Sequence, residues 1–210
     1  MKNIKYAKFI TFEGGESSGK STQSKLLYEY FKASNIPVIL TREIGGVNTA
    51  EDIRELILSH NDLLPMTELM LVMAARNEHV QKTILPALNE GITVICDRFV
   101  DSTACYQGYH NNIGIKATYD MHKNLIGDIM PDITFFLNLA PEAALKRLSQ
   151  RHEINRFDLK DAKFYAKIQE AFHLIEKRFP YRIKNIDTNY KNIKEIHIEI
   201  IKHLELSAVS

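Results

Sequence analysis

Residues 14–21 read GGESSGKS, and this glycine-rich loop constrains the fold of the chain more than any other segment. It fits the pattern G-x-x-x-x-G-K-[ST], which needs a buried strand before it and a helix after it. The run FITF at residues 9–12 has the composition of such a strand. Residues 20–34 carry apolar side chains at helical spacing, at Leu26, Leu27, Tyr30 and Phe31. The start of the chain therefore predicts a strand, a phosphate-binding loop and a helix.

The chemistry of the loop explains its residue types. Glycines let the backbone curl so that its N–H groups point at phosphate oxygens, at a helix N-terminus that favours anions. Lys20 is expected to reach the β- and γ-phosphates, and the Ser21 hydroxyl to bind Mg²⁺. Ser17 stands where many such loops have another glycine. The residues predicted to bind ATP are Gly14, Gly15, Glu16, Ser17, Ser18, Gly19, Lys20, Ser21 and Thr22.

Short apolar runs alternate with helical patterns along the rest of the chain. Strands are predicted at residues 37–41, 92–96, 133–137 and 182–186, and helices at about 49–59, 67–91, from Pro141, at 162–178 and from Lys191. Thr67 is the expected N-cap of the long helix, and Pro86 should kink it or split off its last turn. Strands without polar alternation are typical of parallel sheets. We expect an α/β fold with a doubly wound five-stranded parallel sheet flanked by helices, forming a single domain over residues 1–210.

The composition excludes several classes of protein. Lys and Arg total 27 against 26 acidic residues, so there is no basic excess of the kind that nucleic-acid binding produces. No window approaches the roughly 18 apolar residues of a membrane span. Cys96 and Cys105 have neither the spacing of a zinc site nor that of a disulfide framework. We expect a cytoplasmic protein that binds neither nucleic acid nor membrane.

Charged residues follow two of the predicted strands. VICD at residues 94–97 ends a buried strand in Asp97, which is expected to orient Mg²⁺ beside the phosphate loop. Arg42 and Arg98 also follow strands, at the edge where open α/β sheets bind ligands, and this favours a second anionic ligand. The strings N-K-x-D and D-x-x-G of GTPases and L-S-G-G-Q of ABC-type ATPases are absent. The pattern favours a kinase that acts on a small molecule.

Four strings together resemble bacterial thymidylate kinases, members of the nucleoside monophosphate kinase group of P-loop proteins. They are FEG at 12–14, TREIGG at 41–46, AAR at 74–76 and DRFVDSTACYQG at 97–108. The resemblance spans nearly the whole chain. It implies transfer of the γ-phosphoryl group of ATP to dTMP for dTTP synthesis, with Mg²⁺ as cofactor and a homodimer as the assembly.

The resemblance also implies roles for individual residues. The expected catalytic set is Lys20, Asp97, Arg98, Arg151 and Arg156, with the two last arginines on a short lid at about 146–160, and the metal ligands are Ser21 and Asp97. Glu13 would meet the 3′-hydroxyl of dTMP, Arg98 and Arg42 its phosphate, and Tyr106 its deoxyribose. The loop with Asp187 and Thr188 would lie near adenine. The base would be bound by Val72, Arg76, Thr103 and Gln107.

Three positions depart from the family pattern. Ile44 replaces a proline, so a cis peptide bond is not expected there. Val72 replaces a phenylalanine that stacks on thymine, and Ser17 replaces a loop glycine. Two alternatives stay open at this point: a kinase for another pyrimidine nucleotide or for a deoxynucleoside, and an ATP-binding module without catalytic activity.

Overall fold

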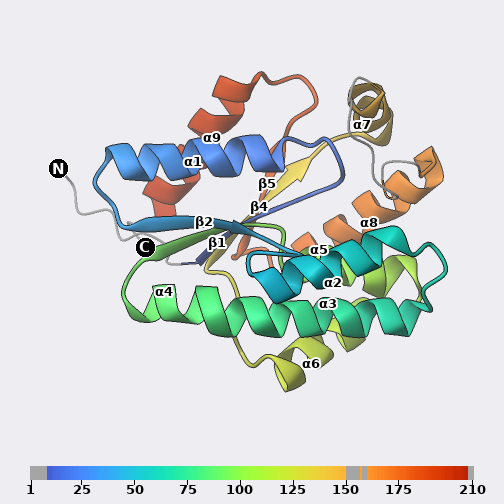
Figure 1. The fold of residues 1–210 in the computed structure, drawn as a ribbon. Coiled ribbons are helices and arrows are strands. Elements are labelled where there is room, and N and C mark those ends of the chain that lie inside the picture. Colours follow the sequence, from blue (N-terminus) through green and yellow to red (C-terminus); the bar gives the residue numbers. More distant parts are fainter. Residues whose placement is uncertain (1–8, 150–156, 158–159, 208–210) are drawn as a thin grey trace.

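The computed structural model describes residues 9–149, 157 and 160–207. Its centre is one sheet of five strands in the order β2-β3-β1-β4-β5 (Figure 1). Every neighbouring pair of strands is parallel, as the sequence predicted. The strands are β1 (Phe9–Glu13), β2 (Val38–Arg42), β3 (Thr93–Asp97), β4 (Ile133–Asn138) and β5 (Ile183–Asp187).

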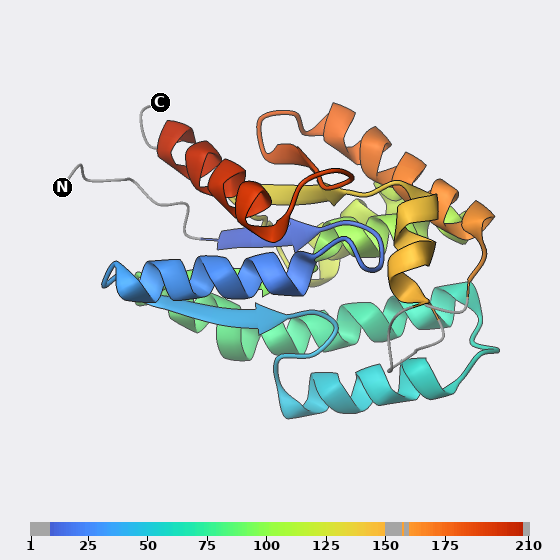
Figure 2. The same cartoon turned by 90° about the horizontal axis from the view of Figure 1, so that it is seen from above.

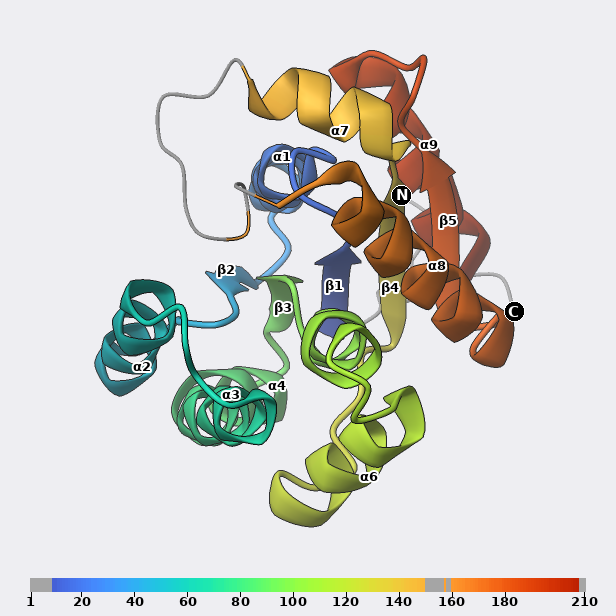
Figure 3. The ribbon, with the colours of Figure 1, turned by 90° about the vertical axis from the view of Figure 1, so that its right-hand side faces the viewer.

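Helices cover both faces of the sheet. Helices α1 (Lys20–Ala33) and α9 (Ile193–Ser207) lie side by side on one face (Figure 2). The opposite face is covered mainly by the helical regions at 65–89 and 100–125 and by the helix at 162–178 (Figure 3). The remaining helical segments are α2 (Asn48–Ser59), α3 (Pro65–His79), η1 (Val80–Ile84), α4 (Leu85–Asn89), α5 (Val100–Thr103), η2 (Ala104–His110), α6 (Ile115–Leu125), α7 (Pro141–Leu148) and α8 (Ala162–Arg178).

The sheet register brings three strand ends to one level. Phe12 of β1 and Arg42 of β2 both pair with Asp97 of β3. The loop after β1 therefore begins directly beside the residues that follow β3. Because the chain leaves β1 toward one edge of the sheet and leaves β3 toward the other, this level is where such sheets bind ligands.

The helical pattern differs from the prediction in two places and agrees with it at Pro86. The long helix starts at Pro65, not at Thr67, because proline suits the first helical position. A π-helical segment, η1, precedes Pro86, and α4 forms a separate short helix, which confirms the predicted break. The helical segments between residues 100 and 125 were not predicted, because Val100, Thr103 and Gly108 are weak helix formers. Among the described residues, no helix is long and apolar enough to cross a membrane.

Candidate active site

The glycine-rich loop lies at the carboxyl end of β1 and leads into α1. Gly14 has a φ of 138°, and a Cβ on it would lie 2.5 Å from the carbonyl oxygen of Leu137. Gly19, directly before α1, has a φ of 99°. Both angles lie in the region that only glycine adopts at low cost. The loop therefore curls as its pattern predicts, with its end at the positive end of the α1 dipole.

Lys20 is buried at the base of this loop. Its Nζ donates to the carbonyl oxygen of Gly15 at 2.7 Å, which holds the ammonium group against the curl of the loop. Burial, together with the positive charge of Arg98, lowers the pKa of Lys20 to about 8. An ammonium group held here, with little water around it, interacts strongly with an anion in the loop.

Ser17 adopts a left-handed backbone conformation with a φ of 57°, as expected where related loops have glycine. Its Oγ is buried, and no described residue gives it a hydrogen-bond partner. Ser17→Gly is expected to raise the free energy of unfolding by about 1 kcal/mol, because it removes the strained conformation and the unpaired hydroxyl. In thermal unfolding this corresponds to a melting temperature about 2–4 °C higher.

Asn35 offers a matched control for this change, since it has a φ of 56° in a turn outside the site. Asparagine tolerates such angles better than serine, so Asn35→Gly should stabilise less. A lower melting temperature for Ser17→Gly than for the unmodified chain would contradict the account of the loop.

Ser21 and Asp97 meet between the loop and β3. The Ser21 Oγ donates to the Asp97 Oδ2 at 2.5 Å, so two hard oxygen donors lie together beside the phosphate loop. Mg²⁺ prefers such donors and usually takes only one or two of them from a protein, the rest coming from phosphates and water. Within the described residues, no cluster of three or more His, Cys, Asp or Glu side chains could hold a metal. The pair fits a magnesium ion carried by a nucleotide.

Arg98 follows Asp97 with a φ of 71°, and its guanidinium group crosses the mouth of the loop. It donates to the Glu16 Oε1 at 2.6 Å, to the carbonyl oxygen of Gly14 at 3.0 Å and to the Ser102 Oγ at 3.0 Å. Burial opposes its charge, but the carboxylate of Glu16 outweighs that effect and raises the pKa of Arg98. Its side chain is thus a fixed, fully charged cation with several directed donors.

Glu13 lies beneath Arg98 and is almost fully buried. Its Oε1 accepts a hydrogen bond from the Phe99 amide at 2.7 Å, and its Oε2 accepts one from the Ser102 hydroxyl. Burial, with the nearby Asp101 carboxylate adding to it, raises the pKa of Glu13 to about 8. Glu13 is not among the residues that line the cavity described next. It holds the turn that carries Arg98.

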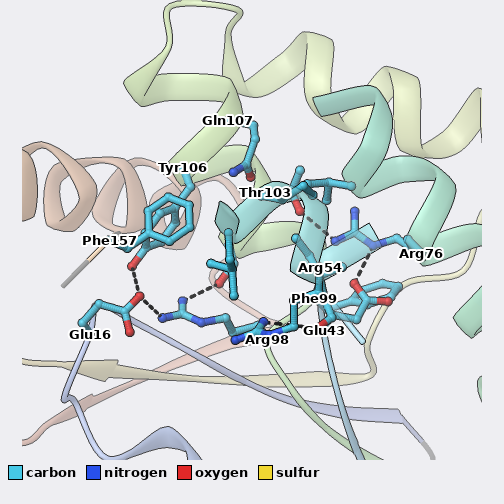
Figure 4. A pocket seen from close by; sticks show the side chains of 15 residues that line it. Glu16, Glu43, Arg54, Arg76, Arg98, Phe99, Thr103, Tyr106, Gln107 and Phe157 are labelled. Atoms are coloured by element: carbon cyan, nitrogen blue, oxygen red, sulfur yellow. Dashed lines mark hydrogen bonds and ion pairs between the residues drawn. The ribbon is translucent and has the colours of Figure 1, made fainter. Parts of the chain in front are cut away.

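A central cavity opens between the loop, α2, α3 and the α5–η2 segment (Figure 4). Arg98, Glu16 and Tyr106 converge at one end of it, and Arg76, Thr103 and Glu43 at the other. Arg98 lines the cavity and also the groove that contains Lys20, Ser21 and Asp97, which we call the phosphate groove. The cavity is lined by Glu16, Glu43, Ile44, Arg54, Ile57, Leu58, Val72, Arg76, Arg98, Phe99, Ser102, Thr103, Tyr106, Gln107 and Phe157.

Arg76 is a buried cation at the far end of the central cavity. Its Nε donates to the Glu43 Oε2 at 2.7 Å and its Nη2 to the Thr103 Oγ1 at 2.7 Å. Burial opposes the charge of Glu43, but Arg76 and His79 together lower the pKa of that carboxyl. His79 contacts the Glu43 Oε1 at 3.0 Å and was not singled out from the sequence. Arg76 therefore has a single fixed orientation.

Arg42, which directly follows β2, and Arg54 on α2 lie differently toward the central cavity. Arg42 points to solvent and pairs with Glu51 at 2.7 Å, and it lines the phosphate groove but not the central cavity. Arg54, on α2, lines both. The sequence carried a signal for Arg54, because it lies three and four residues before Ile57 and Leu58, which line the same cavity. It is a charge on the apolar face of its helix.

The loop after β2 corrects one expectation. The peptide bond between Glu43 and Ile44 is cis, although no proline is present. Contacts on both sides fix the shape of this loop: the Glu43 amide donates to the Asp97 carbonyl oxygen at 2.9 Å, and Arg54 donates to the Ile44 carbonyl oxygen at 3.2 Å. The expectation rested on the preference of non-proline peptide bonds for the trans form. That local preference takes no account of tertiary contacts such as these.

Three further predicted residues concern the open side of the loop and the lid. Thr22 lines an open groove beside the loop, together with Lys191 and Asn192. Arg147 of α7 lines the same groove, and it donates to the carbonyl oxygens of Ser17 and Thr188. Arg151 and Arg156 lie outside the described residues. Phe157 is described, and its ring meets Tyr106 edge-on at 5.7 Å between centroids.

Comparisons with known proteins agree on one family. A model of the thymidylate kinase family matches residues 12–200. The chain is 53% identical over 204 residues to the thymidylate kinase of Rickettsia canadensis strain McKiel, with 97% of this chain and all of that protein covered. It is 52% identical over 206 residues to that of Rickettsia bellii strain OSU 85-389, covering 98% of this chain and all of the relative.

A solved structure of a thymidylate kinase has a similar fold. The crystal structure of thymidylate kinase from Ehrlichia chaffeensis superimposes with a TM-score of 0.77 at 37% sequence identity. The match covers 93% of this chain and 97% of the other. The five-stranded parallel sheet with helices on both faces is thus shared with a solved P-loop enzyme.

Proposed function

The chain belongs to the thymidylate kinase family, and from this premise we propose that it transfers the γ-phosphoryl group of ATP to the phosphate of dTMP. The products are dTDP and ADP. The observation that carries the proposal is the position of Arg98, which lines both the phosphate groove and the central cavity. A cation at that junction suits a reaction in which two phosphate groups must meet.

The reaction needs charge neutralisation more than proton transfer. An oxygen of the dTMP phosphate attacks the γ-phosphorus, and the bond from that phosphorus to the β–γ bridging oxygen breaks, so ADP leaves. A phosphate monoester with a second pKa of about 6 is largely ionised at pH 7 and needs no strong general base. Lys20 faces ATP from the loop, and Arg98 and Arg54 face the acceptor phosphate. Fixed cations of this kind stabilise the transition state of phosphoryl transfer.

Mg²⁺ is the cofactor that we propose, with Ser21 and Asp97 as the residues that hold it. When bound, it neutralises charge on the β- and γ-phosphates. The Ser21 hydroxyl and the Asp97 carboxylate, which lie together between the loop and β3, would hold it. Through the ion, these two side chains would orient the triphosphate toward Arg98.

The central cavity accommodates the nucleoside of dTMP in this proposal. Glu16 takes the contact with the 3′-hydroxyl that the family resemblance assigned to Glu13, because Glu16 lines the cavity and Glu13 does not. Tyr106 packs against the deoxyribose. The base lies toward the buried end, against Val72, Arg76, Thr103 and Gln107.

Several sequence predictions remain part of the proposal. The lid at about 146–160, with Arg151 and Arg156, would close over the phosphates and exclude water that would otherwise hydrolyse ATP. The loop with Asp187 and Thr188 would contact adenine. A single domain and a cytoplasmic location likewise stay predictions.

Val72 lines the cavity where the family places a phenylalanine. Val72→Phe is expected to lower the KM for dTMP about threefold to tenfold, because stacking of an aromatic ring on a base contributes about 0.5–1.5 kcal/mol. Steady-state kinetics at saturating ATP measure this effect. An unchanged KM would mean that another residue supplies the stacking face.

A homodimer through α3 is the assembly that we propose. Met66 and Met70 lie one turn apart on α3 and are 45% and 52% exposed, and Leu64 before them is 71% exposed. Exposed apolar side chains grouped in this way are typical of an interface. Light scattering after gel filtration should give about twice the mass of one chain, 24.1 kDa.

Met70→Glu should shift that assembly to monomers, because it places a charge in the centre of the apolar group. Leu174→Glu is the control, since Leu174 is also 41% exposed but lies on α8. A monomeric unmodified chain would contradict the proposal, and so would a Met70→Glu variant that still elutes as a dimer.

ADP release with a panel of acceptors tests the proposed function. The panel contains dTMP, dUMP, UMP, dCMP and thymidine, each with ATP and Mg²⁺. We expect the highest kcat/KM for dTMP. Faster turnover of another acceptor would favour a different nucleotide or nucleoside kinase. ADP release no faster than with ATP alone would favour a non-catalytic binding module.

A further inference from the structure

Gln107 and Glu68 form a buried pair at the end of the central cavity. Gln107 lies on η2 and lines the cavity, and Glu68 lies in the first turn of α3. The Gln107 Nε2 donates to the Glu68 Oε1 at 2.8 Å, and both side chains are at most 7% exposed. The family resemblance assigned no role to Glu68.

The chemistry of this pair fixes the orientation of the Gln107 amide. An ionised carboxylate can only accept hydrogen bonds, so the amide must turn its nitrogen toward Glu68. Its other end, the Oε1, is a pure acceptor. Reversing the amide would put two oxygens against each other in a buried site, which is costly.

Arg76 supplies hydrogen-bond donors at the same end of the cavity. Glu43 and Thr103 hold its guanidinium group, and the group lines the same cavity as Gln107. The buried end of the cavity therefore presents a donor from Arg76 and an acceptor from Gln107. A ligand edge that complements both carries a carbonyl oxygen next to an N–H group.

We propose that Glu68 is a positioning residue for specificity: by fixing the Gln107 amide, it makes the cavity select pyrimidines with a 4-carbonyl oxygen and an N3–H over cytosine. Cytosine presents the inverse pattern, an amino group beside an unprotonated N3, and would leave buried polar groups unpaired. Sites built on such hydrogen bonds reject mismatched analogues strongly. The inference rests on the proposed function, since it assigns the base to this cavity.

The test compares dUMP with dCMP, which differ only at this edge of the ring. Three variants are measured with ATP and Mg²⁺. Glu68→Gln replaces the carboxylate with an amide that can donate or accept, so the Gln107 amide is no longer held in one orientation. Glu68→Asp keeps the carboxylate. Glu78→Gln removes an equal charge from α3 at an exposed ion pair with Lys82.

The kcat/KM ratio of dUMP to dCMP is the decisive quantity. Glu68→Gln should lower it about tenfold or more, although Arg76 still favours the 4-carbonyl oxygen. Glu68→Asp and Glu78→Gln should keep the ratio within about threefold of the unmodified chain. A folded Glu68→Gln variant with an unchanged ratio would overturn the proposal.

Gln107→Met separates positioning from a general structural role. It should lower the ratio by itself, and Glu68→Gln should have no further effect in that background, because the amide to be oriented is gone. An equal effect of Glu68→Gln with and without Gln107 would contradict the inference. If Glu68→Gln does not fold, the pair of Glu68→Asp and Gln107→Met decides: the first must keep the ratio and the second must lower it.

Failure of this inference differs from failure of the proposed function. If the unmodified chain phosphorylates dTMP but Glu68→Gln keeps its selectivity, only the role of Glu68 is wrong. If the unmodified chain does not phosphorylate dTMP at all, the proposed function is wrong.

Discussion

Replacing Lys20 with methionine is expected to lower kcat about 10²- to 10³-fold, with little change in the KM for dTMP. The ammonium group lies buried in the phosphate loop, 2.7 Å from the Gly15 carbonyl oxygen. Methionine keeps most of the side-chain volume but has no charge. The triphosphate would then lose a cation at the point where negative charge develops in the transition state. The coupled ADP assay at saturating dTMP measures this effect.

Lysine 25 provides the control, because Lys25 is exposed on the same helix. Lys25→Met should stay within about threefold of the unmodified chain. A Lys20→Met variant with a similarly small loss would contradict the role of Lys20.

The dependence on pH gives a second signature of Lys20. Its pKa of about 8 means that, in the free enzyme, the charged form is lost as the pH rises through that value. We therefore expect kcat/KM for ATP to decline above about pH 8, and we expect Lys20→Met to lack that alkaline decline. The same profile in both proteins would assign the decline to another group.

Arg98→Ala is expected to lower kcat/KM for dTMP about 10²- to 10³-fold, through both a higher KM and a lower kcat. The guanidinium group touches the loop through Gly14 and Glu16 and also lines the central cavity. Its loss removes a cation from both substrates and leaves the Glu16 carboxylate without that partner. The KM for ATP should change much less, because Lys20 and the loop backbone remain.

Two further variants make the Arg98 result specific. Arg98→Lys keeps the charge but not the directed fork of donors, so it should fall between alanine and the unmodified chain. Arg178→Ala removes an exposed arginine at the end of α8 and should have no effect on dTMP kinetics. Unchanged dTMP kinetics in Arg98→Ala would contradict its proposed contact with the acceptor phosphate.

The sequence predicted the sheet well because its strands are strongly patterned. Each of the five strands lies within one residue of its predicted position at either end. Buried parallel strands are continuous apolar runs, and the loop after β1 has a pattern that only one arrangement satisfies. The same reasoning placed Asp97 and Arg98 beside the loop, because parallel strands end at one edge of the sheet.

The sequence could not separate residues that differ only in where their side chains point. Glu13 and Glu16 are three residues apart, and only the curl of the loop places Glu16 in the cavity and Glu13 in the core. Likewise, Arg42 directly follows its strand but turns to solvent, whereas Arg54 reaches the site from α2. Such choices depend on packing between distant segments.

The α5–η2 segment shows the same limit for secondary structure. Gly108 packs so closely that a Cβ on it would lie 2.4 Å from the Thr118 Oγ1. This contact joins η2 to α6 and favours a helix that Gly108 itself disfavours. Tertiary packing therefore outweighs local propensity here.

Transfer of labelled phosphate tests the central claim most directly. ATP labelled at its γ-phosphate is incubated with dTMP, Mg²⁺ and the protein, and the products are separated. The account predicts that the label appears in dTDP, with little in inorganic phosphate, because in the proposed mechanism the two substrates meet at Arg98 and the lid excludes water. Label only in inorganic phosphate, or label that stays in ATP, would contradict it.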